Sequence, residues 1–311
     1  MLTATQLQTA LSPPATPVQR LQAPLFDRQG VEFWVKRDDL IDAEIPGNKW
    51  RKLKYNLIAA RQAGYSRLLT FGGAYSNHLH AVAHAGRRFD FETVGIVRGE
   101  PPPTLNNTLR QCRACGMDLH FISRKEYKQI NTTAYIDQLK AQFGDVCVIP
   151  QGGSNALATR GCGELAEEIN HQLECPAYIA TACGTGGTLA GMIRAAKVEQ
   201  QLLGIVVLKG ASVLANDVEQ LAQPEKPALL SASWQLIHDY HFGGYAKIPA
   251  PLKDFVIEFN AQFGFKIEPI YTGKLFFGLF ELVLQGYFEP GTRLVAVHTG
   301  GLQYLKQYRE K

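Results

Sequence analysis

The stretch "YIATACGTGGTLAG", residues 178–191, joins an apolar run to a helix-like run through a glycine-rich turn. Glycines let the backbone curl so that several N–H groups converge, and the start of the following helix adds positive potential. The hydroxyls of Thr185 and Thr188 supply two further donors. The stretch therefore predicts a strand, a phosphate-binding loop and a helix. The alternative is a plain tight turn.

The residues around this turn limit the kind of phosphate that it suits. The dinucleotide-binding motif G-x-G-x-x-G, counted from Gly184, needs a third glycine at position 189, where this chain has Leu189. The motif also needs an acidic residue on the next strand, and the strand-like run 202–210 has none. The lysine of a nucleotide-binding P-loop is also missing, because Met192 follows Gly191. A single phosphate on a smaller cofactor is favoured.

Strand-like and helix-like runs alternate along the rest of the chain. Such alternation indicates parallel sheets that are covered by helices on both faces. We expect strands at 31–39, 67–73, 92–99, 118–123, 145–150, 177–184, 202–210 and 292–300, and helices at 48–64, 77–89, 104–116, 155–170, 186–199 and 251–263. In the helix at 48–64, the residues Trp50, Leu53, Leu57 and Ile58 fall on one face.

Three glycine-rich turns follow expected strands, at 72–78, 183–188 and 298–301. Ligands of open parallel sheets bind beyond the carboxyl ends of the strands. The three turns together therefore predict one ligand site, with more specificity than any single turn carries.

The turn in "FGGAYSNHLHA", residues 71–81, offers a site for a carboxylate. Ser76 and Asn77 are favourable residues for a helix N-cap, and their side chains and free backbone N–H groups suit an anion. Ordinary capping is the alternative.

Three histidines follow in the same segment. His80 and His84 have the i, i+4 spacing of a zinc-binding helix, but the glutamate that should follow the first histidine is absent. We therefore expect no metal site, and assign His78, His80 and His84 to helix packing and to the polarity of the active site.

Lys49, in "GNKWRKL", stands at the start of an expected helix. A lysine becomes a nucleophile when it loses water or is crowded by positive charge, and Arg51, Lys52 and Lys54 supply such charge. A Schiff-base lysine near a single-phosphate loop and a carboxylate pocket suggests pyridoxal 5'-phosphate as the cofactor. The alternative is an ordinary solvated lysine.

Composition argues against several other classes of protein. The chain has 311 residues, a net charge of +4 and 46% hydrophobic residues. No Lys/Arg run with interleaved aromatics indicates nucleic-acid binding, and no signal peptide or apolar membrane span is visible. The six cysteines are scattered, so we expect reduced thiols in a cytoplasmic protein. A redox or metal role for the Cys112/Cys115 pair is the minor alternative.

With these motifs in place, the sequence resembles the tryptophan-synthase-β type of pyridoxal-phosphate enzyme, fold type II. Within that type it resembles the family of 1-aminocyclopropane-1-carboxylate (ACC) deaminase and D-cysteine desulfhydrase. The matching stretches, in order, are "VKRDDL", "GNKWRKL", "TFGGAYSNHLHA", "GGSN", "GTGGTLAG", "GGYAKIP", "EPIYTGK" and "HTGG".

The resemblance implies an α/β chain of two domains, with parallel-rich sheets flanked by helices and the cofactor in the cleft. We expect a large cofactor-binding domain of residues 1–50 plus 160–311 and a small domain of residues 51–159. The family also implies a homodimer, a small amino-acid substrate, and no membrane or nucleic-acid partner.

The resemblance also implies which residues hold the cofactor. Lys49 would form the internal aldimine and then move protons. Asn77 would hydrogen-bond the 3-hydroxyl of the cofactor. The phosphate would be held by Lys52, Gly184, Thr185, Gly186, Gly187 and Thr188.

For the substrate, the resemblance implies that the turn of Ser76, Asn77 and His78 binds the carboxylate, and that Ser76 assists proton transfer. Tyr245 and Tyr271 would border the substrate and orient it or shuttle a proton. Buried aromatic packing is the alternative for these two tyrosines.

Two threonines favour one member of the family. ACC deaminases carry Glu and Leu where this chain has Thr272 and Thr299, and desulfhydrase-like members carry threonine at both positions. We expect both threonines to contact the cofactor. A hydroxyl in place of a carboxylate leaves the nitrogen of the cofactor ring neutral, and the cofactor is then a weaker electron sink. Expulsion of a thiolate needs less electron withdrawal than the opening of a cyclopropane ring.

The sequence therefore predicts a lyase that converts D-cysteine, or a related β-substituted amino acid, to pyruvate, ammonia and sulfide by α,β-elimination. The alternatives are an ACC deaminase, a cysteine-synthase-like replacement enzyme or racemase, and a non-catalytic phosphometabolite-binding protein. One departure from the family is the C-terminal "LQYLKQYREK", which replaces a different ending in its relatives.

Overall fold

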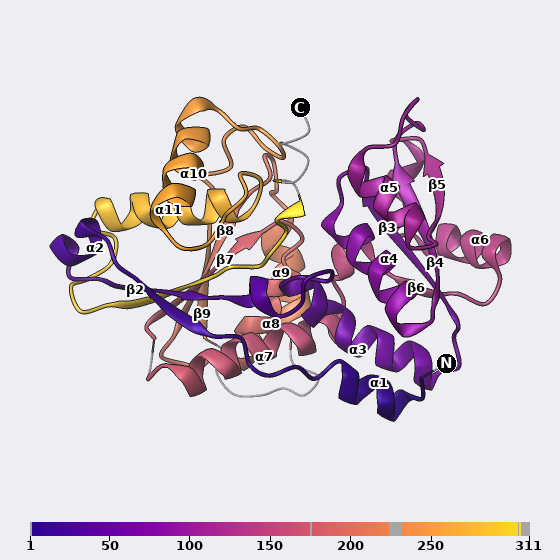
Figure 1. The fold of residues 1–311 in the computed structure, drawn as a ribbon, viewed down its shortest axis with the longest axis horizontal. Coiled ribbons are helices and arrows are strands. Elements are labelled where there is room, and N and C mark those ends of the chain that lie inside the picture. Colours follow the sequence, from indigo (N-terminus) through magenta and orange to yellow (C-terminus); the bar gives the residue numbers. More distant parts are fainter. Residues whose placement is uncertain (1, 175, 224–231, 304, 306–311) are drawn as a thin grey trace.

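The computed structural model describes residues 2–174, 176–223, 232–303 and 305. It has two β-sheets that lie side by side, each flanked by helices (Figure 1). One sheet has six strands in the order β1-β2-β10-β7-β8-β9, and the other has four in the order β5-β4-β3-β6. The expected α/β class is confirmed.

The six-stranded sheet draws its strands from both ends of the chain. Its strands are β1 (Val18–Leu21), β2 (Glu32–Lys36), β10 (Arg293–Val297), β7 (Tyr178–Cys183), β8 (Gln201–Val206) and β9 (Ser233–Ile237). Neighbouring strands are parallel except for β1, which pairs antiparallel with β2. The sheet is therefore parallel-rich, as expected, with one antiparallel pair at its edge.

Alternation along the strands explains why both faces of this sheet are covered. Leu294 and Ala296 of β10 join the core beneath α2 (Pro24–Gln29), α10 (Ala250–Gln262) and α11 (Thr272–Leu284). Val295 and Val297 point to the other face, where α7 (Ala156–Gln172), α8 (Gly187–Ala195) and α9 (Leu214–Ala222) pack. Successive strand residues face opposite sides, so a continuous apolar strand can serve two cores.

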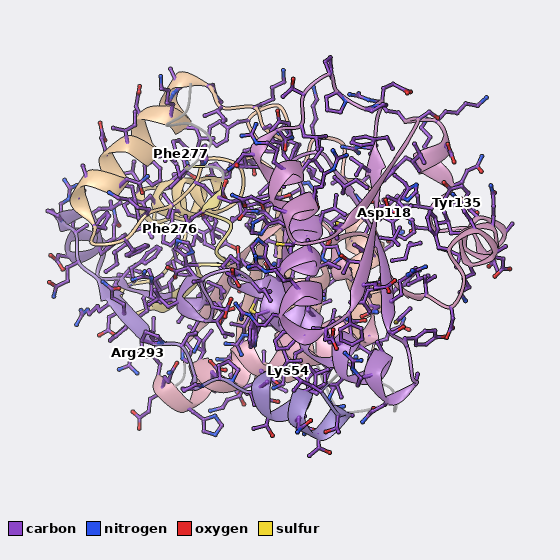
Figure 2. All side chains as sticks on the ribbon, turned by 45° about the vertical axis from the view of Figure 1, so that its right-hand side comes forward. Lys54, Asp118, Tyr135, Phe276, Phe277 and Arg293 are labelled. Carbon is purple, nitrogen blue, oxygen red and sulfur yellow. The ribbon has the colours of Figure 1, made fainter. Side chains whose placement is uncertain are left out.

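The four-stranded sheet is entirely parallel, with strands β5 (Asp118–Ile122), β4 (Glu92–Arg98), β3 (Arg67–Gly73) and β6 (Cys147–Ile149). On one face its residues pack with α3 (Asn48–Gln62), α4 (Asn77–Phe89) and α5 (Asn107–Ala114), together with Leu7 of α1 (Ala4–Ala10). The other face is covered by α6 (Thr133–Phe143) and by the short 3-10 helix Glu126–Gln129. Phe276 and Tyr135 mark the cores of the two sheets, at opposite sides of the molecule (Figure 2).

The predicted strands and helices are all present, some of them shorter than expected. The strand expected at 31–39 ends at Lys36, because a 3-10 helix, Asp38–Leu40, follows it. The helix expected at 186–199 ends at Ala195. The elements that were not predicted are α1, β1, α2, α6, α9, β9 and α11, together with three 3-10 helices, of which the third is Gln151–Gly153. The division into domains at residues 50 and 160 stays a prediction.

Helix α3 connects the two halves and carries Lys49 in its first turn. Its predicted apolar face, Trp50, Leu53, Leu57 and Ile58, is buried in a single core cluster, as expected. On its other side it approaches α7 so closely that a Cβ on Gly161 would lie 2.0 Å from the carbonyl oxygen of Arg51. This contact fixes the start of α3 against the six-stranded side.

Of the helices in the described residues, none is both long and apolar enough to cross a membrane.

Candidate active site

A cavity of about 440 Å³ lies where the carboxyl ends of strands from both sheets meet. All three glycine-rich turns contribute to its wall, as the sequence predicts. Its lining includes Asn48, Lys49, Lys52, Gly72–His78, Arg98, Arg124, Gln151, Gly152, Ala182–Leu189, Tyr245, Tyr271, Thr299 and Gly300.

The amine of Lys49 has few partners. Asn48 Oδ1, at 3.3 Å, is the one hydrogen-bond partner that its Nζ has within the described part of the chain. Loss of water around the amine, followed by the positive charge of Lys52, lowers the pKa of Lys49 to about 7. A substantial fraction of this amine is therefore neutral and nucleophilic near pH 7.

Gly47 places Lys49 against the turn that follows β10. Its φ is +62°, and a Cβ on it would lie 1.9 Å from the carbonyl oxygen of Thr299. A side chain at this position is therefore excluded by both conformation and space. The next residue, Asn48, donates from Nδ2 to Thr188 Oγ1 at 2.8 Å, which ties the start of α3 to the glycine loop.

The loop between β7 and α8 forms an anion cradle with Lys52. Gly186, at φ +75°, is the N-cap of α8, and a Cβ on Gly187 would lie 2.9 Å from Lys52 Nζ. Lys52 Nζ donates to Ser154 Oγ at 3.0 Å, and Ser154 Oγ lies 2.7 Å from Thr185 Oγ1. A helix N-terminus, a cation and hydroxyl groups therefore surround a space that glycines keep open, which fits a phosphate group.

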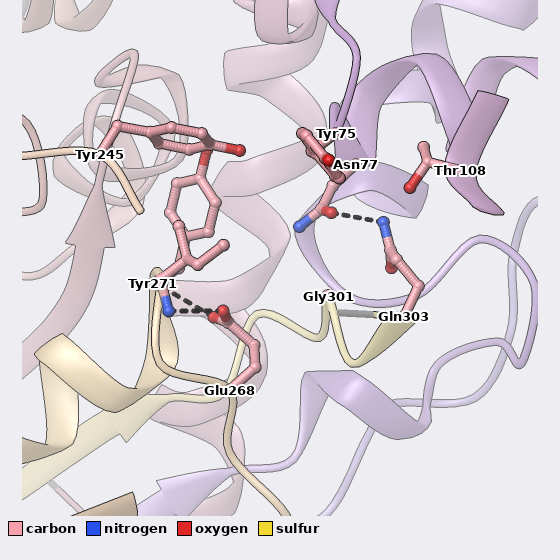
Figure 3. A pocket seen from close by; sticks show the side chains of 9 residues that line it. Tyr75, Asn77, Thr108, Tyr245, Glu268, Tyr271, Gly301 and Gln303 are labelled. Atoms are coloured by element: carbon pink, nitrogen blue, oxygen red, sulfur yellow. Dashed lines mark hydrogen bonds between the residues drawn. The ribbon is translucent and has the colours of Figure 1, made fainter. Parts of the chain in front are cut away.

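Opposite the cradle, Ser76 caps α4. Its Oγ accepts from the backbone N–H groups of His78 and Leu79, both at 3.2 Å, so its own hydrogen is available to donate. The side chain of Gln303 donates to Asn77 Oδ1 (Figure 3). This contact leaves the Nδ2 group of Asn77 as a donor.

His78 is neutral in this site. Thr70 Oγ1 donates to the carbonyl of Ile149 and lies 2.9 Å from His78 Nε2, so that nitrogen carries the ring hydrogen. His78 Nδ1 has no hydrogen-bond partner among the described residues. Burial, with the charges of Lys49 and Lys52, lowers the pKa of His78 well below its usual value. This ring can accept a hydrogen bond but brings no positive charge to a carboxylate.

Tyr245 and Tyr271 form the wall that faces Tyr75 and Asn77 (Figure 3). Their ring centroids are 6.0 Å apart in an edge-to-face arrangement. Burial raises the pKa of Tyr271 well above its usual value, so its phenol stays protonated.

Glu268 fixes the position of Tyr271. Its buried carboxylate accepts from the backbone N–H groups of Ile270, Tyr271 and Thr272 at 2.7–2.8 Å, and so holds the segment that leads into α11. The matching stretch "EPIYTGK" contains this residue, but no chemical role was predicted for it.

The two threonines that were expected to contact the cofactor differ in position. Thr299 lines the cavity. Thr272 is not among the described residues that line it, because its buried hydroxyl accepts from the backbone N–H of Glu268 at 2.9 Å. The contact of Thr272 with the cofactor stays a prediction, as does that of Thr299.

The described residues contain no group of three or more His, Cys, Asp or Glu residues that could hold a metal ion. His80 instead contacts Gln111 at 2.7 Å, and His84 lies 3.5 Å from Glu44. Cys112 and Cys115 are free thiols, and burial raises the pKa of Cys112 to about 12.

Sequence reasoning missed several residues at this site, namely Ser154, Glu268, Gln303, Arg98 and Arg124. Three of them could have been found from the sequence. Ser154, Arg98 and Arg124 each lie at or just beyond the carboxyl end of a strand, where ligand-binding residues are expected. No local pattern indicates that Gln303 reaches Asn77 across 226 residues of sequence.

Comparisons with known proteins bear on the chemistry of this cavity. A family model described as pyridoxal-phosphate dependent enzyme matches residues 11–300. A putative ACC deaminase of Pyrococcus horikoshii is 30% identical over 311 residues, covering 97% of this chain and 94% of its own length.

Two further relatives carry other names. A D-cysteine desulfhydrase of Klebsiella pneumoniae is 32% identical and covers 94% of this chain and 93% of its own length. A mitochondrial bifunctional D-cysteine desulfhydrase/ACC deaminase of Arabidopsis thaliana is 31% identical and covers 92% of this chain and 76% of its own length. Among solved structures, one described as an ACC deaminase homologue superposes with a TM-score of 0.81 at 26% identity, covering 100% of this chain and 99% of that one.

Proposed function

Because the chain belongs to the family of pyridoxal-phosphate-dependent enzymes and has the tryptophan-synthase-β fold, fold type II, we propose that it is an α,β-eliminating lyase. Its substrate is D-cysteine or a related β-substituted amino acid, and its products are pyruvate, ammonia and sulfide. The observation that carries the proposal is the amine of Lys49, with a pKa of about 7, on the wall of a cavity that also contains the anion cradle and the Ser76 turn.

The residues of the cavity fit the cofactor of the family. The phosphate would be held by Lys52, Ser154, Thr185, Gly186, Gly187 and Thr188, with Gly184 beside them. Lys49 would bind the aldehyde, and Asn77 Nδ2 would donate to the ring hydroxyl. When bound, the cofactor withdraws electrons from the α-carbon of the substrate, and most strongly when its ring nitrogen is protonated.

The chain itself supplies the groups that bind the substrate and move its protons. The hydroxyl of Ser76 donates to the substrate carboxylate at the N-terminus of α4, where the helix dipole favours an anion. Lys49 takes the α-proton when its amine is neutral and returns it when charged. The phenol of Tyr271, which burial keeps protonated, and the side chain of Tyr245 border the substrate on one side.

Elimination is favoured over ring opening by the charges of the cavity. None of the described residues that line the 440 Å³ cavity is Asp or Glu. The carboxylate of Glu268, in the small pocket beside it, already accepts from three backbone N–H groups. The described lining therefore offers no carboxylate that would hold the cofactor ring nitrogen protonated. A weaker electron sink suits a leaving group such as a thiolate, which departs readily. The desulfhydrase names of two relatives agree with this proposal.

An amino-acid panel tests the function. Cofactor-loaded protein is offered D- and L-cysteine, D- and L-serine, and ACC, and the 2-oxo acid formed is measured. Pyruvate from D-cysteine, without 2-oxobutanoate from ACC, is the expected result. Lys49→Ala should abolish turnover, whereas Lys54→Ala, which removes a lysine paired with Glu164 outside the cavity lining, should retain it. Turnover by Lys49→Ala would remove Lys49 from its role.

ACC deamination to 2-oxobutanoate and ammonia is the second candidate, because several relatives and a structural neighbour carry that name. 2-Oxobutanoate from ACC, without pyruvate from D-cysteine, would replace the leading proposal. A protein that gains no visible absorption with pyridoxal phosphate would favour a non-catalytic binding protein instead.

We also propose a cytoplasmic homodimer. The five described cysteines are free thiols, which is usual in a reducing compartment, and the dimer rests on the resemblance to the family. Light scattering on the eluting protein tests the mass, for which twice that of the chain is expected.

A further inference from the structure

We propose that, among β-substituted amino acids, this cavity prefers those whose side chain ends in an anionic group, and that Arg98 and Arg124 recognise that group. The inference rests on the proposed function, because it specifies the class of amino acid that the same site accepts.

Both arginines stand at the carboxyl ends of neighbouring strands in the four-stranded sheet. Arg98 ends β4 and is in register with Gly73 of β3 and with Ile122 of β5, and Arg124 follows β5 by two residues. Both line the 440 Å³ cavity. A Cβ on Gly73 would lie 3.6 Å from Arg98 Nη2, so this guanidinium extends over the start of the Ser76 turn.

Neither guanidinium is neutralised within the part of the chain that the structure describes. No Asp or Glu oxygen of the described residues lies within 4.0 Å of Arg98 or Arg124. Arg98 lies 5.5 Å from the centre of the Tyr127 ring, a contact that leaves its charge intact. By contrast, Arg51 pairs with three carboxylates and Arg88 with two. Arginines kept free of carboxylates at a cavity are suited to bidentate recognition of an anionic ligand.

The order of the strands separates these arginines from the phosphate cradle. Lys52 of the cradle donates to the carbonyl of Gly152 and to the hydroxyl of Ser154, in the segment that follows β6. From β6 the strands of the sheet follow in the order β3, β4, β5. With strands about 4.8 Å apart, the end of β4 lies roughly 10 Å from that of β6, and the end of β5 roughly 14 Å from it. The Ser76 turn follows β3, between them. The phosphate is therefore served by Lys52, and the arginines lie on the opposite side of the turn that would bind the substrate carboxylate.

A substrate that is held by its α-carboxylate on the Ser76 turn leaves both guanidinium groups for a second negative group. A carboxylate, sulfonate or phosphate at the end of the side chain has that charge. For O-phosphoserine, the Cβ–O bond would break with its electron pair leaving on the phosphate oxygen, and the α-proton would pass to Lys49. One water is consumed, and the products are pyruvate, ammonium and phosphate, without any oxidant or reductant.

Calorimetric titration of the cofactor-loaded protein tests the preference without relying on turnover. O-phosphoserine should bind about tenfold more tightly than serine of the same configuration, as one charge-assisted hydrogen-bonded pair predicts. The preference should shrink as salt is raised. The double variant Arg98→Gln/Arg124→Gln should bind O-phosphoserine no more tightly than serine, and each single variant should lose part of the preference. Arg113→Gln removes an equal charge from an exposed position on α5 and should retain the preference.

Two results would overturn the inference. In the first, the unaltered protein binds serine and O-phosphoserine equally well. In the second, the double variant weakens both ligands to the same extent, which would assign the arginines to the α-carboxylate. Visible absorption of the bound cofactor, recorded before each titration, identifies failure of the proposed function separately.

Discussion

Lys49 differs from its charged neighbours in what surrounds it. Lys54 pairs with Glu164 at 2.6 Å, and Arg51 with Asp38 at 2.6 Å, so their charges are largely neutralised. Lys52 donates to a carbonyl and a hydroxyl, and keeps its charge near Lys49. The sequence predicted an amine with a lowered pKa from the cluster of positive charges. The structure assigns the larger effect to loss of water, and only Lys52 among the three neighbours adds to it.

The reactivity of Lys49 should therefore follow a pKa of about 7 and not 10.5. The rate at which cofactor-free protein takes up pyridoxal phosphate, followed by absorption in a stopped-flow instrument, should rise between pH 6 and 8 and then level off. Between the two pKa values the unfolded chain binds more protons than the folded one, so the free energy of unfolding contributed by this group rises with pH. A free lysine derivative is the control. An uptake rate that keeps rising to pH 10 would contradict the assignment.

Asn77 is oriented by a residue far away in the sequence. Because Gln303 donates to Asn77 Oδ1, the amide presents Nδ2 as its remaining polar group. The resemblance to a family implied a role for Asn77, but the residue that holds it lies in the C-terminal stretch where this chain departs from its relatives. Sequence reasoning therefore predicted a role for Asn77 but did not predict the residue that orients it.

Gln303→Leu should weaken cofactor binding by about three- to tenfold, because loss of one hydrogen bond of about 1 kcal/mol frees the amide to rotate. Equilibrium dialysis against pyridoxal phosphate measures the effect. Gln262→Leu, on the exposed end of α10, is the matched control and should bind as the unaltered protein does. Equal affinity for all three proteins would show that Gln303 does not orient Asn77.

At the scale of elements, α3 is fixed by a buried ion network. Arg51, 2% exposed, binds Asp38 from the 3-10 helix after β2 and Glu168 from α7, and Glu168 also accepts from Lys36 of β2 at 2.6 Å. Periodicity predicted the helix and its apolar face. It could not predict this network, because Arg51 and its partner Glu168 are 117 positions apart.

Arg51→Ala should lower the free energy of unfolding by about 3–5 kcal/mol, because it leaves the carboxylate of Asp38 buried without its cation. Arg67→Ala, which breaks an exposed pair with Glu92, should cost no more than about 1 kcal/mol. Urea titrations of the cofactor-free proteins compare the two. Similar losses for both variants would mean that the buried network contributes little to holding α3.

Two elements show why some of the fold was not predicted. Helix α11, "TGKLFFGLFELVL", is apolar almost all round, so it has no single apolar face for periodicity to detect. Strand β1 has only four residues and lies at the edge of the sheet. Its pairing with β2 makes it a strand, and so short a segment has no sequence pattern that predicts one. Both elements depend on contacts with distant parts of the chain.

At the scale of the whole molecule, the site is the place where two sheets present their strand ends to each other. The rule that ligands bind beyond the carboxyl ends of parallel strands was enough to bring the three glycine turns together. The order of strands could not be predicted. That order places Ser154 beside Thr185, and it places Arg98 and Arg124 on the far side of the Ser76 turn. The contact of Thr272 with the cofactor stays a prediction, and the hydroxyl of Thr272 accepts from the backbone N–H of Glu268 within its own turn.

The central claim is that Lys49, and no other lysine, attaches the cofactor in this cavity. Protein loaded with pyridoxal phosphate is reduced with borohydride and digested, and the modified peptide is identified by mass spectrometry. We expect permanent loss of the visible absorption and a single modified peptide that contains Lys49, with no modification in Lys49→Ala. Modification of a different lysine, or unchanged labelling of the variant, would contradict it.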